Sequence, residues 1–465
     1  MLTKSVGANP NYLATIVQLG EPIPHRNADR LQIFICGGNR VITDLSYNKG
    51  DICVFFPLES KLSGKLLSAL NMYEDKNLNA DNTQKGYVNS KSRVRAVKLR
   101  EEPSMGLVLM LKVVESVMGD AGGVDVGTEF DTWNGTLICE KYIPACGTVP
   151  SGEVRVKGPQ ARVNRINRMV EGQFRLHEDT TQLRRNMHKL SPEDIISITY
   201  KMHGTSWVVG NVLTKSVLTW KDRVAKFFGV KVKETEYDYI YSSRSVIKNK
   251  FANANPNHYY GTDLWGDIKD HLRDRVPPGF TLYGEAVGFT STNGAIQKGY
   301  DYGYRPRDKF LDIDKAASQD PYSYEEYQEG KHFGVYVYRI TFTTVSGFKT
   351  ELTWSQIKDF CAWFGLRHVP ELFYGKAQDW GFAQEHWHEN VLAKLEANYL
   401  EKDCDMCTNK VPAEGVVVRK DSLLNFEAYK LKSFRFLEGE TKALDIGEID
   451  IETQQANGDE ENVAA

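Results

Sequence analysis

The sequence ISITYKMHGTSWVVGN, residues 196–211, combines two predicted strands with a short polar turn between them. Apolar and polar residues alternate from Ile196 to Tyr200, which is the pattern of a half-buried strand, and a second apolar run follows the Gly-Thr-Ser turn. Lys201 therefore ends the first strand beside Gly204, which has no Cβ to block the approach of a ligand. A lone lysine of this kind is more often a solvated surface residue, so its role depends on the rest of the chain.

The length and composition point to a soluble protein of several domains. At 465 residues the chain is too long for one core of ordinary size, so we expect two or three domains. Charged residues make up 26% of it, and no apolar run is long enough to cross a bilayer. Residues 1–11 are polar and contain glycine, unlike a secretion signal. We therefore expect a cytoplasmic monomer with no membrane partner.

The cysteines favour reduced thiols over a disulfide framework, because there are seven of them, an odd number scattered through a long chain. Cys404 and Cys407 form the one suggestive C-x-x-C pair. A structural zinc site needs four ligands, and neither a second C-x-x-C nor a nearby H-x-x-x-H supplies the others. Cys139 and Cys146 would complete the set only through a tertiary contact, so zinc binding by the pair stays open.

Positive charge is concentrated before the opening stretch, although the chain as a whole carries a net charge of -3. The basic residues of this segment are Arg155, Lys157, Arg162, Arg165, Arg168, Arg175, Arg184, Arg185 and Lys189. Such a segment can contact the phosphate backbone of a nucleic acid or can simply be a solvated face, and both interpretations stay open.

The N-terminal part predicts a small β-barrel. Five β-rich runs separated by Gly, Asn and Pro lie at residues 12–17, 31–36, 52–56, 94–99 and 106–110. Five strands within about 110 residues suggest an OB-fold. We therefore expect an OB-like barrel domain over residues 1–120.

Two short motifs in this domain resemble the OB-type tRNA-binding modules appended to some aminoacyl-tRNA synthetases. His25-Arg-Asn-Ala-Asp-Arg-Leu31 is similar to their H-P-N-A-D-x-L signature, and Lys98-Leu-Arg100 with Ser104-Met-Gly106 is similar to their K-x-R-G-x-x-S-x-G strand. Arg26 stands in place of the proline, and Glu101 in place of a glycine. The resemblance implies an OB barrel without assigning tRNA specificity, and a barrel that only braces the second domain is the alternative.

The remainder divides into three stretches. Residues 121–173 are broken by Gly and Pro and are predicted to be a basic linker, and residues 174–445 form a more regular second domain. Within it, the tyrosine-rich residues 300–331 are predicted to be an insertion loop. Residues 446–465 form an acidic tail that we expect to be disordered.

The second domain alternates strand-like runs with helices, which makes the whole chain α+β. Strands are predicted at residues 216–220, 241–246, 280–288, 334–340, 414–419 and 428–432. Basic and apolar residues alternate over residues 221–233, a pattern that predicts an inserted helix or hairpin. Helices are predicted at residues 353–364, which begin with the capping pair Thr353 and Gln356, and at residues 385–400.

These strands supply the groups that a covalent lysine nucleotidyltransferase needs. A lysine amine must attack the α-phosphate of a nucleotide, cations must offset the phosphate charge, carboxylates must hold ribose and metal, and an aromatic face must hold the base. The candidates are Lys201 as nucleophile, Glu285 and Glu414 as carboxylates, Arg244, Lys430 and Lys432 as phosphate cations, and Tyr338 as the stacking face. Lys430 and Lys432 are two residues apart on a strand, so both point to the same side.

Six motifs in order resemble those of the covalent nucleotidyltransferase superfamily of ligases and mRNA capping enzymes. They are K-x-H-G-T, S-R, Y-G-E-x-x-G, Y-x-Y-R, E-G-V-V-V-R and Y-K-L-K-S, from Lys201 to Ser433. The histidine of K-x-H-G, where DNA ligases and capping enzymes usually have aspartate, is similar to the RNA ligase 2 group. An OB module placed before the transferase, rather than after it, is also similar to the RNA ligases. The expected fold is an OB-like barrel followed by a nucleotidyltransferase domain of antiparallel sheets with flanking helices.

The resemblance implies a role for each matching residue. Lys201 would form lysyl-AMP, and Glu414 would assist binding of Mg²⁺ or Mn²⁺. The nucleotide-binding residues would be Tyr200, His203, Gly204, Arg244, Glu285 on the ribose and Tyr338 on adenine, with Lys430 and Lys432 on the α-phosphate. Arg339 departs from the aromatic-Asp pair of many relatives and receives no role. A core tyrosine at position 338 and a surface lysine at position 430 are the structural alternatives.

The resemblance as a whole implies an ATP-dependent RNA ligase that repairs RNA through lysyl-AMP and RNA-adenylate intermediates. Its partner would be RNA, and the sequence does not decide between a nicked duplex, a broken tRNA and a single strand. A DNA ligase or a capping-type guanylyltransferase is the enzymatic alternative. A non-catalytic OB-fold RNA-binding protein is the alternative of another class, and the intact Lys201 and Glu414 count against it.

Overall fold

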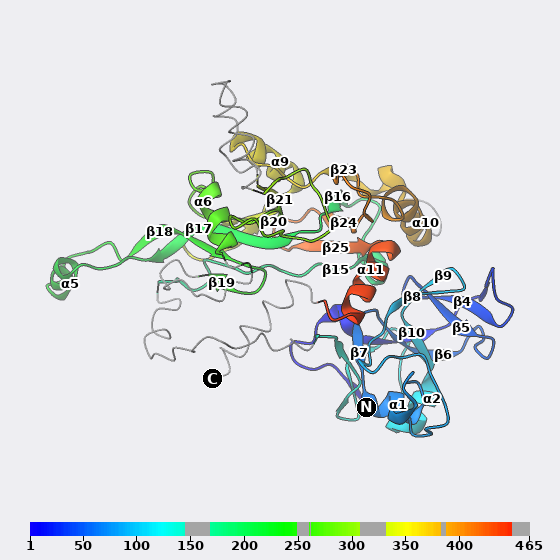
Figure 1. The fold of residues 1–465 in the computed structure, drawn as a ribbon. Helices are drawn as coiled ribbons and strands as arrows, with labels where there is room; N and C mark the ends of the chain where they lie inside the picture. Colours follow the sequence, from blue (N-terminus) through cyan, green and yellow to red (C-terminus); the bar gives the residue numbers. More distant parts are fainter. Residues whose placement is uncertain (145–167, 249–259, 261, 307–331, 383–386, 449–465) are drawn as a thin grey trace.

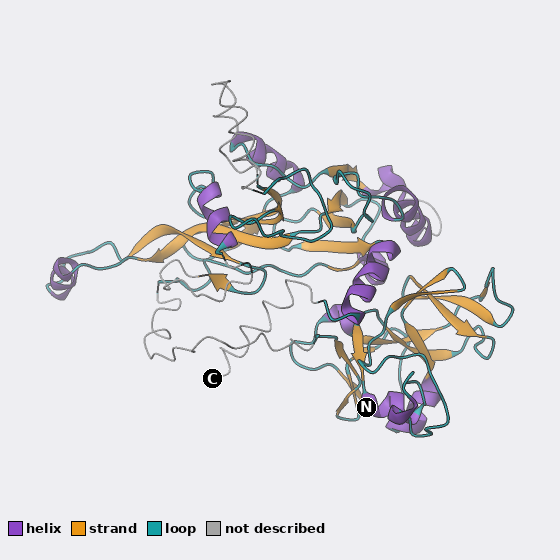
Figure 2. Cartoon of the chain, viewed as in Figure 1, coloured by secondary structure: helices purple, strands orange, loops and turns teal. Residues whose placement is uncertain are grey.

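The computed structural model of the chain describes residues 1–144, 168–248, 260, 262–306, 332–382 and 387–448 (Figure 1). Four of the basic candidates, Arg155, Lys157, Arg162 and Arg165, lie outside the described residues. So do Cys146, most of the tyrosine-rich segment and the end of the acidic tail. Mixed α+β architecture is evident in the cartoon, with helices around several sheets (Figure 2). None of the described helices combines the length and apolar character needed to cross a membrane.

The N-terminal part consists of small antiparallel sheets that share apolar cores. Its strands are β1 (Leu2–Thr3), β2 (Ala14–Gln18), β3 (Ile23–Pro24), β4 (Leu31–Cys36), β5 (Asn39–Asp44), β6 (Ile52–Phe56), β7 (Ser60–Leu62), β8 (Ala96–Leu99), β9 (Glu102–Met105) and β10 (Leu107–Met110). Helices α1 (Gly64–Ala69) and α2 (Leu111–Met118) and the 3-10 turns η1 (Pro10–Tyr12) and η2 (Lys76–Leu78) accompany them. Each of the five predicted β-rich runs contains a strand, while closure into an OB barrel stays a prediction.

Four further strands continue the N-terminal part beyond residue 120. They are β11 (Glu129–Phe130), β12 (Thr132–Trp133), β13 (Thr136–Leu137) and β14 (Cys139–Lys141). β11 pairs with β2, β12 with β1, and β14 with β7, and the Trp133 side chain is buried in the same core. We therefore propose that the N-terminal domain extends at least to Lys141, and that a linker begins after it.

The second domain is built on two sheets. The five-stranded sheet has the order β15-β25-β24-β16-β23 and the six-stranded sheet the order β19-β18-β17-β20-β21-β22, with β15–β25 as a parallel pair. The five-stranded sheet contains β15 (Thr181–Gln182), β16 (Ile195–Lys201), β23 (Glu371–Lys376), β24 (Gly415–Lys420) and β25 (Glu427–Lys432). The six-stranded sheet contains β17 (Thr205–Lys215), β18 (Thr235–Ser242), β19 (Ile247–Lys248), β20 (Phe280–Gly288), β21 (Phe333–Thr343) and β22 (Lys349–Glu351).

Helices cover both sheets and form separate apolar cores with them. α6 (Leu264–Leu272) and α9 (Trp354–Trp363) share a core with β17, β20 and β21. α4 (Leu183–Asn186), α10 (Trp387–Leu395) and the π-helical turn η5 (Glu396–Leu400) share a core with β16, β24 and β25. Two short turns, η3 (Met187–Lys189) and η4 (Gln378–Phe382), complete this side.

Some predicted elements are confirmed and others are wrong. The capping box of Thr353 and Gln356 begins α9, as predicted from the sequence. Residues 216–220 are not a strand, because Thr219 caps the N-terminus of α5 (Trp220–Phe227) through a capping box with Asp222. This helix is the inserted element expected within residues 221–233. The predicted strand 241–246 ends early, since β18 stops at Ser242.

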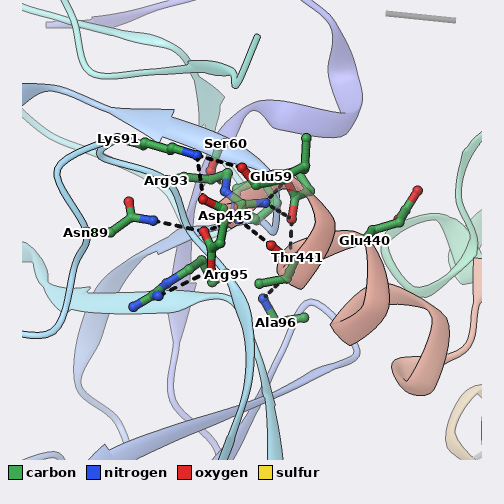
Figure 3. A network of polar contacts seen from close by, with 12 residues as sticks. Glu59, Ser60, Asn89, Lys91, Arg93, Arg95, Ala96, Glu440, Thr441 and Asp445 are labelled. Carbon is green, nitrogen blue, oxygen red and sulfur yellow. Dashed lines mark hydrogen bonds and ion pairs between the residues drawn. The ribbon is translucent and has the colours of Figure 1, made fainter. Parts of the chain in front are cut away.

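Helix α11 (Phe434–Asp445) follows the last strand of the second domain and packs against the N-terminal domain. Ser433 caps it by accepting a hydrogen bond from the backbone N of Phe436. At its other end the buried Arg93 of the N-terminal domain donates to the Thr441 carbonyl at 2.9 Å and to Asp445 Oδ1 at 2.6 Å. Arg93 also binds both carboxylate oxygens of Glu59, at 2.8 and 3.0 Å (Figure 3). The N-terminal domain is thereby attached to the element that follows β25.

Candidate active site

A cavity of about 480 Å³, a volume typical of small-molecule sites, lies where the two sheets meet. The N-terminal domain closes part of it with Asn11, Tyr12, Glu59, Lys141 and Tyr142. All ten residues selected from the sequence line this one cavity, namely Tyr200, Lys201, His203, Gly204, Arg244, Glu285, Tyr338, Glu414, Lys430 and Lys432. Residues separated by more than 200 positions in the sequence are thus brought together by the fold.

The turn after Lys201 carries the chain from one sheet to the other. Lys201 ends β16 in the five-stranded sheet, and β17 of the six-stranded sheet begins at Thr205. A Cβ on Gly204 would lie 2.3 Å from the carbonyl oxygen of Ala286 and 2.9 Å from Cγ of Glu285, both in β20. The glycine is therefore required for packing of the turn against β20, which differs from the expected reason, the approach of a ligand.

Glu414 is the buried centre of the charges around Lys201. Its side chain precedes β24, whose Gly415 lies opposite both Lys201 of β16 and Lys432 of β25. Lys201 Nζ is 2.6 Å and Lys432 Nζ 3.6 Å from Glu414 Oε1. Burial acts to raise the pKa of Glu414, but Lys201, His203 and Lys432 outweigh it and hold this pKa far below its usual range. Glu414, only 5% exposed, is therefore a carboxylate anion at neutral pH.

The second oxygen of Glu414 is incompletely satisfied. In the described part of the chain no hydrogen-bond partner lies within 3.5 Å of Oε2, and His203 Nδ1 is just outside this distance at 3.6 Å. Buried carboxylate oxygens nearly always have partners, so one without them indicates a ligand position. No cluster of three or more His, Cys, Asp or Glu side chains able to hold a metal occurs in the described part of the chain. A divalent ion here would therefore rely on Glu414 together with substrate and water oxygens.

The two lysines of β25 differ in their surroundings. Lys432 is paired with Glu440 of α11 at 2.8 Å; burial lowers the pKa of Lys432, but Glu440 and Glu414 outweigh this and raise it above its usual range. Burial, together with the nearby Lys432, Arg244 and Lys201, lowers the pKa of Lys430 to about 7. Of the two lysines, Lys430 is therefore the one whose protonated form an incoming anion would stabilise more.

Two residues that the sequence did not reveal hold the nucleotide-binding candidates. Asp179 Oδ1 accepts from Arg244 Nη2 at 2.7 Å and from Nε at 3.1 Å. Burial raises the pKa of Asp179, but Arg244 outweighs this effect and lowers it. The hydroxyl of Tyr338 lies 2.9 Å from His177 Nδ1, with the two rings edge to face. Both partners come from the segment before β15, which carries no motif, so only its charged and imidazole side chains distinguish it.

The His203 ring is enclosed by aromatic side chains. Tyr300 and Phe436 contact it edge-on, with ring centroids 4.7 and 4.9 Å away. The backbone N of His203 donates to the hydroxyl of Tyr302 at 2.9 Å. The start of the tyrosine-rich segment therefore packs on the K-x-H-G turn, a role that the sequence left open.

Glu285 and Tyr200 are placed differently from each other. Ser206 and Glu285 lie opposite each other on β17 and β20, with Ser206 Oγ 3.4 Å from Glu285 Oε2. Tyr200 precedes Lys201 on β16, and side chains alternate along a strand. Its hydroxyl donates to Asp405, and its ring packs edge-on against Tyr399. The Tyr200 side chain is thus engaged with the loop around Asp405 rather than with Lys201.

Arg339, which departs from the expected motif, has a structural role. It is fully buried and donates to Glu351 Oε1 at 2.6 Å and to Oε2 at 2.9 Å. Glu178 pairs with it as well, and the Phe426 ring lies 4.2 Å from its guanidinium. Arg339 is not among the residues that line the cavity.

The C-x-x-C pair lies in a loop after η5, and both thiols are partly buried and free of disulfides. A hydrogen bond from Cys407 lowers the pKa of the Cys404 thiol to about 7. The same interaction raises the pKa of Cys407. Since the described residues form no ligand cluster around these thiols, the pair alone supports no zinc site.

Comparison with known proteins places these features in a family. The family model described as "RNA ligase" matches residues 194–434, more than half of the chain. The sequence has no match among curated proteins.

Solved structures of an RNA ligase from Naegleria gruberi have a similar fold. A lysine-to-methionine mutant of it with AMP and Mn has a TM-score of 0.52 and 16% identity, covering 92% of this chain and 98% of that one. A lysine-to-alanine mutant with ATP and Mn has a TM-score of 0.52 and 15% identity, and the enzyme with pyrophosphate has a TM-score of 0.52 and 16% identity. Each of these two matches covers 93% of this chain and 99% of the other. At these identities the likeness concerns the fold. On the evidence of the family model, this chain belongs to the RNA ligase family and is an enzyme that joins RNA ends.

Proposed function

We propose that this RNA ligase uses ATP and forms a covalent lysyl-AMP on Lys201. The observation that carries the proposal is the position of Lys201 Nζ, 2.6 Å from the buried Glu414, in a cavity that also contains Arg244, Lys430 and Lys432. Nζ attacks the α-phosphorus of ATP, a nitrogen–phosphorus bond forms, and the bond to the β-phosphate oxygen breaks. Pyrophosphate leaves, and the nitrogen gives up its proton to solvent.

The ion pair with Glu414 sets a condition for this attack. An ammonium group held by a carboxylate has no lone pair to donate, so Lys201 must lose its proton and move away from Glu414 before it reacts. Lys432 already lies 3.6 Å from the same oxygen, and it can neutralise Glu414 when Lys201 leaves. The resting pair therefore keeps the nucleophile protected until a nucleotide rearranges the charges.

The nucleotide would be held by the groups that line the cavity. We assign the adenine to the face of Tyr338 and the ribose to Glu285 with Ser206. The phosphates go to Arg244, Lys430 and Lys432, with His203 beside them, while Gly204 and the backbone of Tyr200 shape the turn. Preorganised cations of this kind stabilise charge that develops on the departing pyrophosphate.

A divalent cation fits this site because Glu414 Oε2 has no hydrogen-bond donor in the described part of the chain. Mg²⁺ and Mn²⁺ take oxygen ligands, and Mg²⁺ is commonly held by one or two carboxylates together with substrate phosphates. When bound, Mg²⁺ or Mn²⁺ would neutralise negative charge on the triphosphate. Glu414 is the residue that would hold it.

RNA joining then follows in two transfers. A 5′-phosphate oxygen of RNA attacks the phosphorus of lysyl-AMP, which releases Lys201 and forms an RNA-adenylate. A 3′-hydroxyl next attacks that 5′-phosphate, and AMP leaves as the RNA is sealed. We propose that a monomer in the cytoplasm performs this reaction on nicked duplexes or broken tRNA, with the N-terminal domain against the RNA backbone.

The covalent step is tested by incubation with α-labelled ATP or GTP and Mg²⁺ or Mn²⁺, followed by a denaturing gel. We expect label from ATP on the wild-type chain and on the control Lys376→Ala, an exposed lysine of β23, and none on Lys201→Ala. Label that persists in Lys201→Ala would refute the nucleophile. Label from GTP alone would indicate a guanylyltransferase, and no label would favour a non-catalytic RNA-binding protein.

Sealing assays on nicked duplexes, with RNA or DNA as the strand that bears the 3′-hydroxyl, test the choice of polynucleotide. We expect faster sealing with RNA at that position. Equal or faster sealing with DNA would contradict the proposed substrate without affecting the assignment of Lys201.

A further inference from the structure

The hairpin of β17 and β18 extends well beyond the sheet and carries α5 at its tip (Figures 1 and 2). The last paired residues of the two strands are Lys215 and Thr235. We call the residues between them, 216–234, the arm. The function derived above makes no use of it.

Large aromatic side chains are exposed on the arm. Trp220 is 71% exposed, Phe227 85% and Phe228 74%. Phe227 and Phe228 contact each other edge to face, with ring centroids 5.4 Å apart, and no core of the domain includes them. Three exposed aromatic rings within nine residues form an apolar surface of the kind that marks an interaction site.

Cations surround these rings. Five basic residues occur in the arm against two acidic ones, and all five are exposed: Lys221, Arg223, Lys226, Lys231 and Lys233. The carboxylate of Asp222 is occupied by the helix cap at Thr219, and Glu234 pairs with Lys226 at 2.9 Å. Lys221 Nζ lies 6.0 Å from the centre of the Trp220 ring. The arm therefore presents aromatic faces and positive charge together, on a chain whose net charge is negative.

Both strands of the hairpin lead from the arm to the active-site cavity, β17 from Ser206 and β18 toward Arg244. β17 begins beside the cavity, where Ser206 lines it, and runs without a break to Lys215. Nine residue steps at about 3.3 Å each place the base of the arm roughly 30 Å from the cavity. A nucleic acid strand with one phosphate per about 3.4 Å covers this length in roughly nine nucleotides.

We propose that the arm is a second RNA-binding site, at which bases stack on Trp220, Phe227 and Phe228 and phosphates contact the surrounding lysines. The proposal rests on the proposed function, because it assumes that the RNA whose ends are joined continues from the cavity toward the arm. Stacking platforms combined with positive charge are the means by which proteins hold nucleic acid strands without sequence preference. The same side chains would suit an anionic membrane surface, but membrane contact offers no use for a site in line with the reacting RNA ends.

An armless variant provides the direct test. Because the backbone N of Ser216 donates to the Glu234 carbonyl at 2.8 Å, an Asn-Gly turn can replace residues 217–233 and close a two-residue hairpin on this pair, with the register of the two strands unchanged. We expect this variant to form lysyl-AMP like the wild type. It should bind and seal nicked duplexes of about six base pairs on each side that continue into single-stranded RNA tails of about 15 nucleotides at least about tenfold less well. The same duplexes without tails, too short to reach the arm, should be bound and sealed equally by both proteins.

Two sets of substitutions separate stacking from charge. Trp220→Ala, Phe227→Ala and Phe228→Ala together should weaken binding of the tailed duplexes at least about fivefold for each base that stacks. Lys221→Gln, Lys226→Gln and Lys231→Gln together should lower the slope of log affinity against log salt by about 2, at roughly 0.7 for each phosphate that the variant no longer neutralises. Trp363→Ala is the matched control, an 84% exposed tryptophan at the end of α9, and should change nothing.

Fluorescence anisotropy with labelled RNA measures binding independently of catalysis. If the armless variant binds and seals the tailed duplexes like the wild type while both form lysyl-AMP, the arm proposal is overturned and the proposed function stands. Vesicles of anionic phospholipid that bind the wild type but not the aromatic variant, with RNA binding unchanged in both, would overturn it in favour of a membrane contact. Absence of lysyl-AMP in the wild type would instead refute the covalent mechanism, and the anisotropy comparison would still decide the arm.

Discussion

Glu351 and Glu414 are both buried carboxylates held by basic side chains, but their surroundings differ in one respect. Arg339 donates to both oxygens of Glu351, and Lys349 lies 2.8 Å from Oε1. Glu414 has Lys201 and Lys432 on Oε1, and no donor on Oε2 among the described residues. In both, nearby cations outweigh burial and lower the carboxyl pKa.

The difference shows how to separate a structural ion pair from a chemical one. Glu351 does not line the cavity, and both of its oxygens have partners, which is consistent with a purely structural role beside β21. Glu414 lines the cavity, its Oε2 has no hydrogen-bond partner among the described residues, and in the proposed mechanism Lys201 leaves its Oε1. Buried charge alone does not mark a catalytic site, whereas an incomplete pair beside a cavity does.

Removal of Glu351 should have the largest effect on stability. Glu351→Ala leaves the buried Arg339 without its main partner, and such a loss costs about 3–5 kcal/mol in the free energy of unfolding. Urea denaturation of the variant measures it. The double variant Arg339→Met with Glu351→Leu should recover most of this loss, because well-packed apolar residues often replace a buried ion pair without penalty. A double variant as unstable as the single one would contradict this account.

Glu414→Gln should instead lower the rate of lysyl-AMP formation. Glutamine preserves the shape but removes the charge that positions Lys201 and the proposed metal, so we expect lysyl-AMP formation to slow by about 100- to 1,000-fold. Rapid-quench measurement with labelled ATP provides the rate, and Glu351→Gln, assayed at a temperature where it is folded, is the matched control. An equal slowing in the two variants would remove the distinction between the two carboxylates.

Much of this contrast was accessible from the sequence, and part of it was not. The alternation of apolar residues predicted β20 with its observed bounds, Phe280–Gly288. The ten residues selected from the sequence with the help of the ordered motifs all line one cavity in the structure. His177 and Asp179 were missed because they reach the site only through tertiary contacts with Tyr338 and Arg244. The motif departure at position 339 was visible, but its partner Glu351 belongs to a neighbouring strand whose pairing no local pattern specifies.

The pH dependence of ATP binding tests the role of Lys430, one of the cations in the same site. Its pKa of about 7 means that the free protein loses this charge as the pH rises above about 7. Because the protonated amine binds phosphate, ATP affinity should be flat below this pH and should fall by up to about tenfold per pH unit above it. Titration calorimetry between about pH 6 and 9 measures this. Lys430→Met should bind more weakly without this decline, and a decline of the same size in the variant would exclude Lys430 as its source.

The smallest expected effect is at Tyr338. Tyr338→Phe keeps the aromatic face but loses the hydrogen bond with His177 that fixes the ring, so the Kd for ATP should rise by no more than about fivefold. Tyr338→Leu also removes the stacking face and should raise this Kd further. If phenylalanine and leucine give the same affinity, the base does not stack on this ring, and the buried-tyrosine interpretation holds.

If the nucleotide binds as proposed, helix α11 couples its binding to the contact with the N-terminal domain. Glu440 holds Lys432 in the cavity, and the next residue, Thr441, together with Asp445 holds Arg93 of the N-terminal domain. A phosphate that draws Lys432 from Glu440 changes the electrostatic environment of the helix to which that domain is bound. Coupling of this kind is reciprocal. If nucleotide binding strengthens the domain contact by a given free energy, the domain contact strengthens nucleotide binding by the same amount, and a weakening is shared in the same way. Weakening the Arg93 contact should therefore change ATP affinity although Arg93 does not line the cavity.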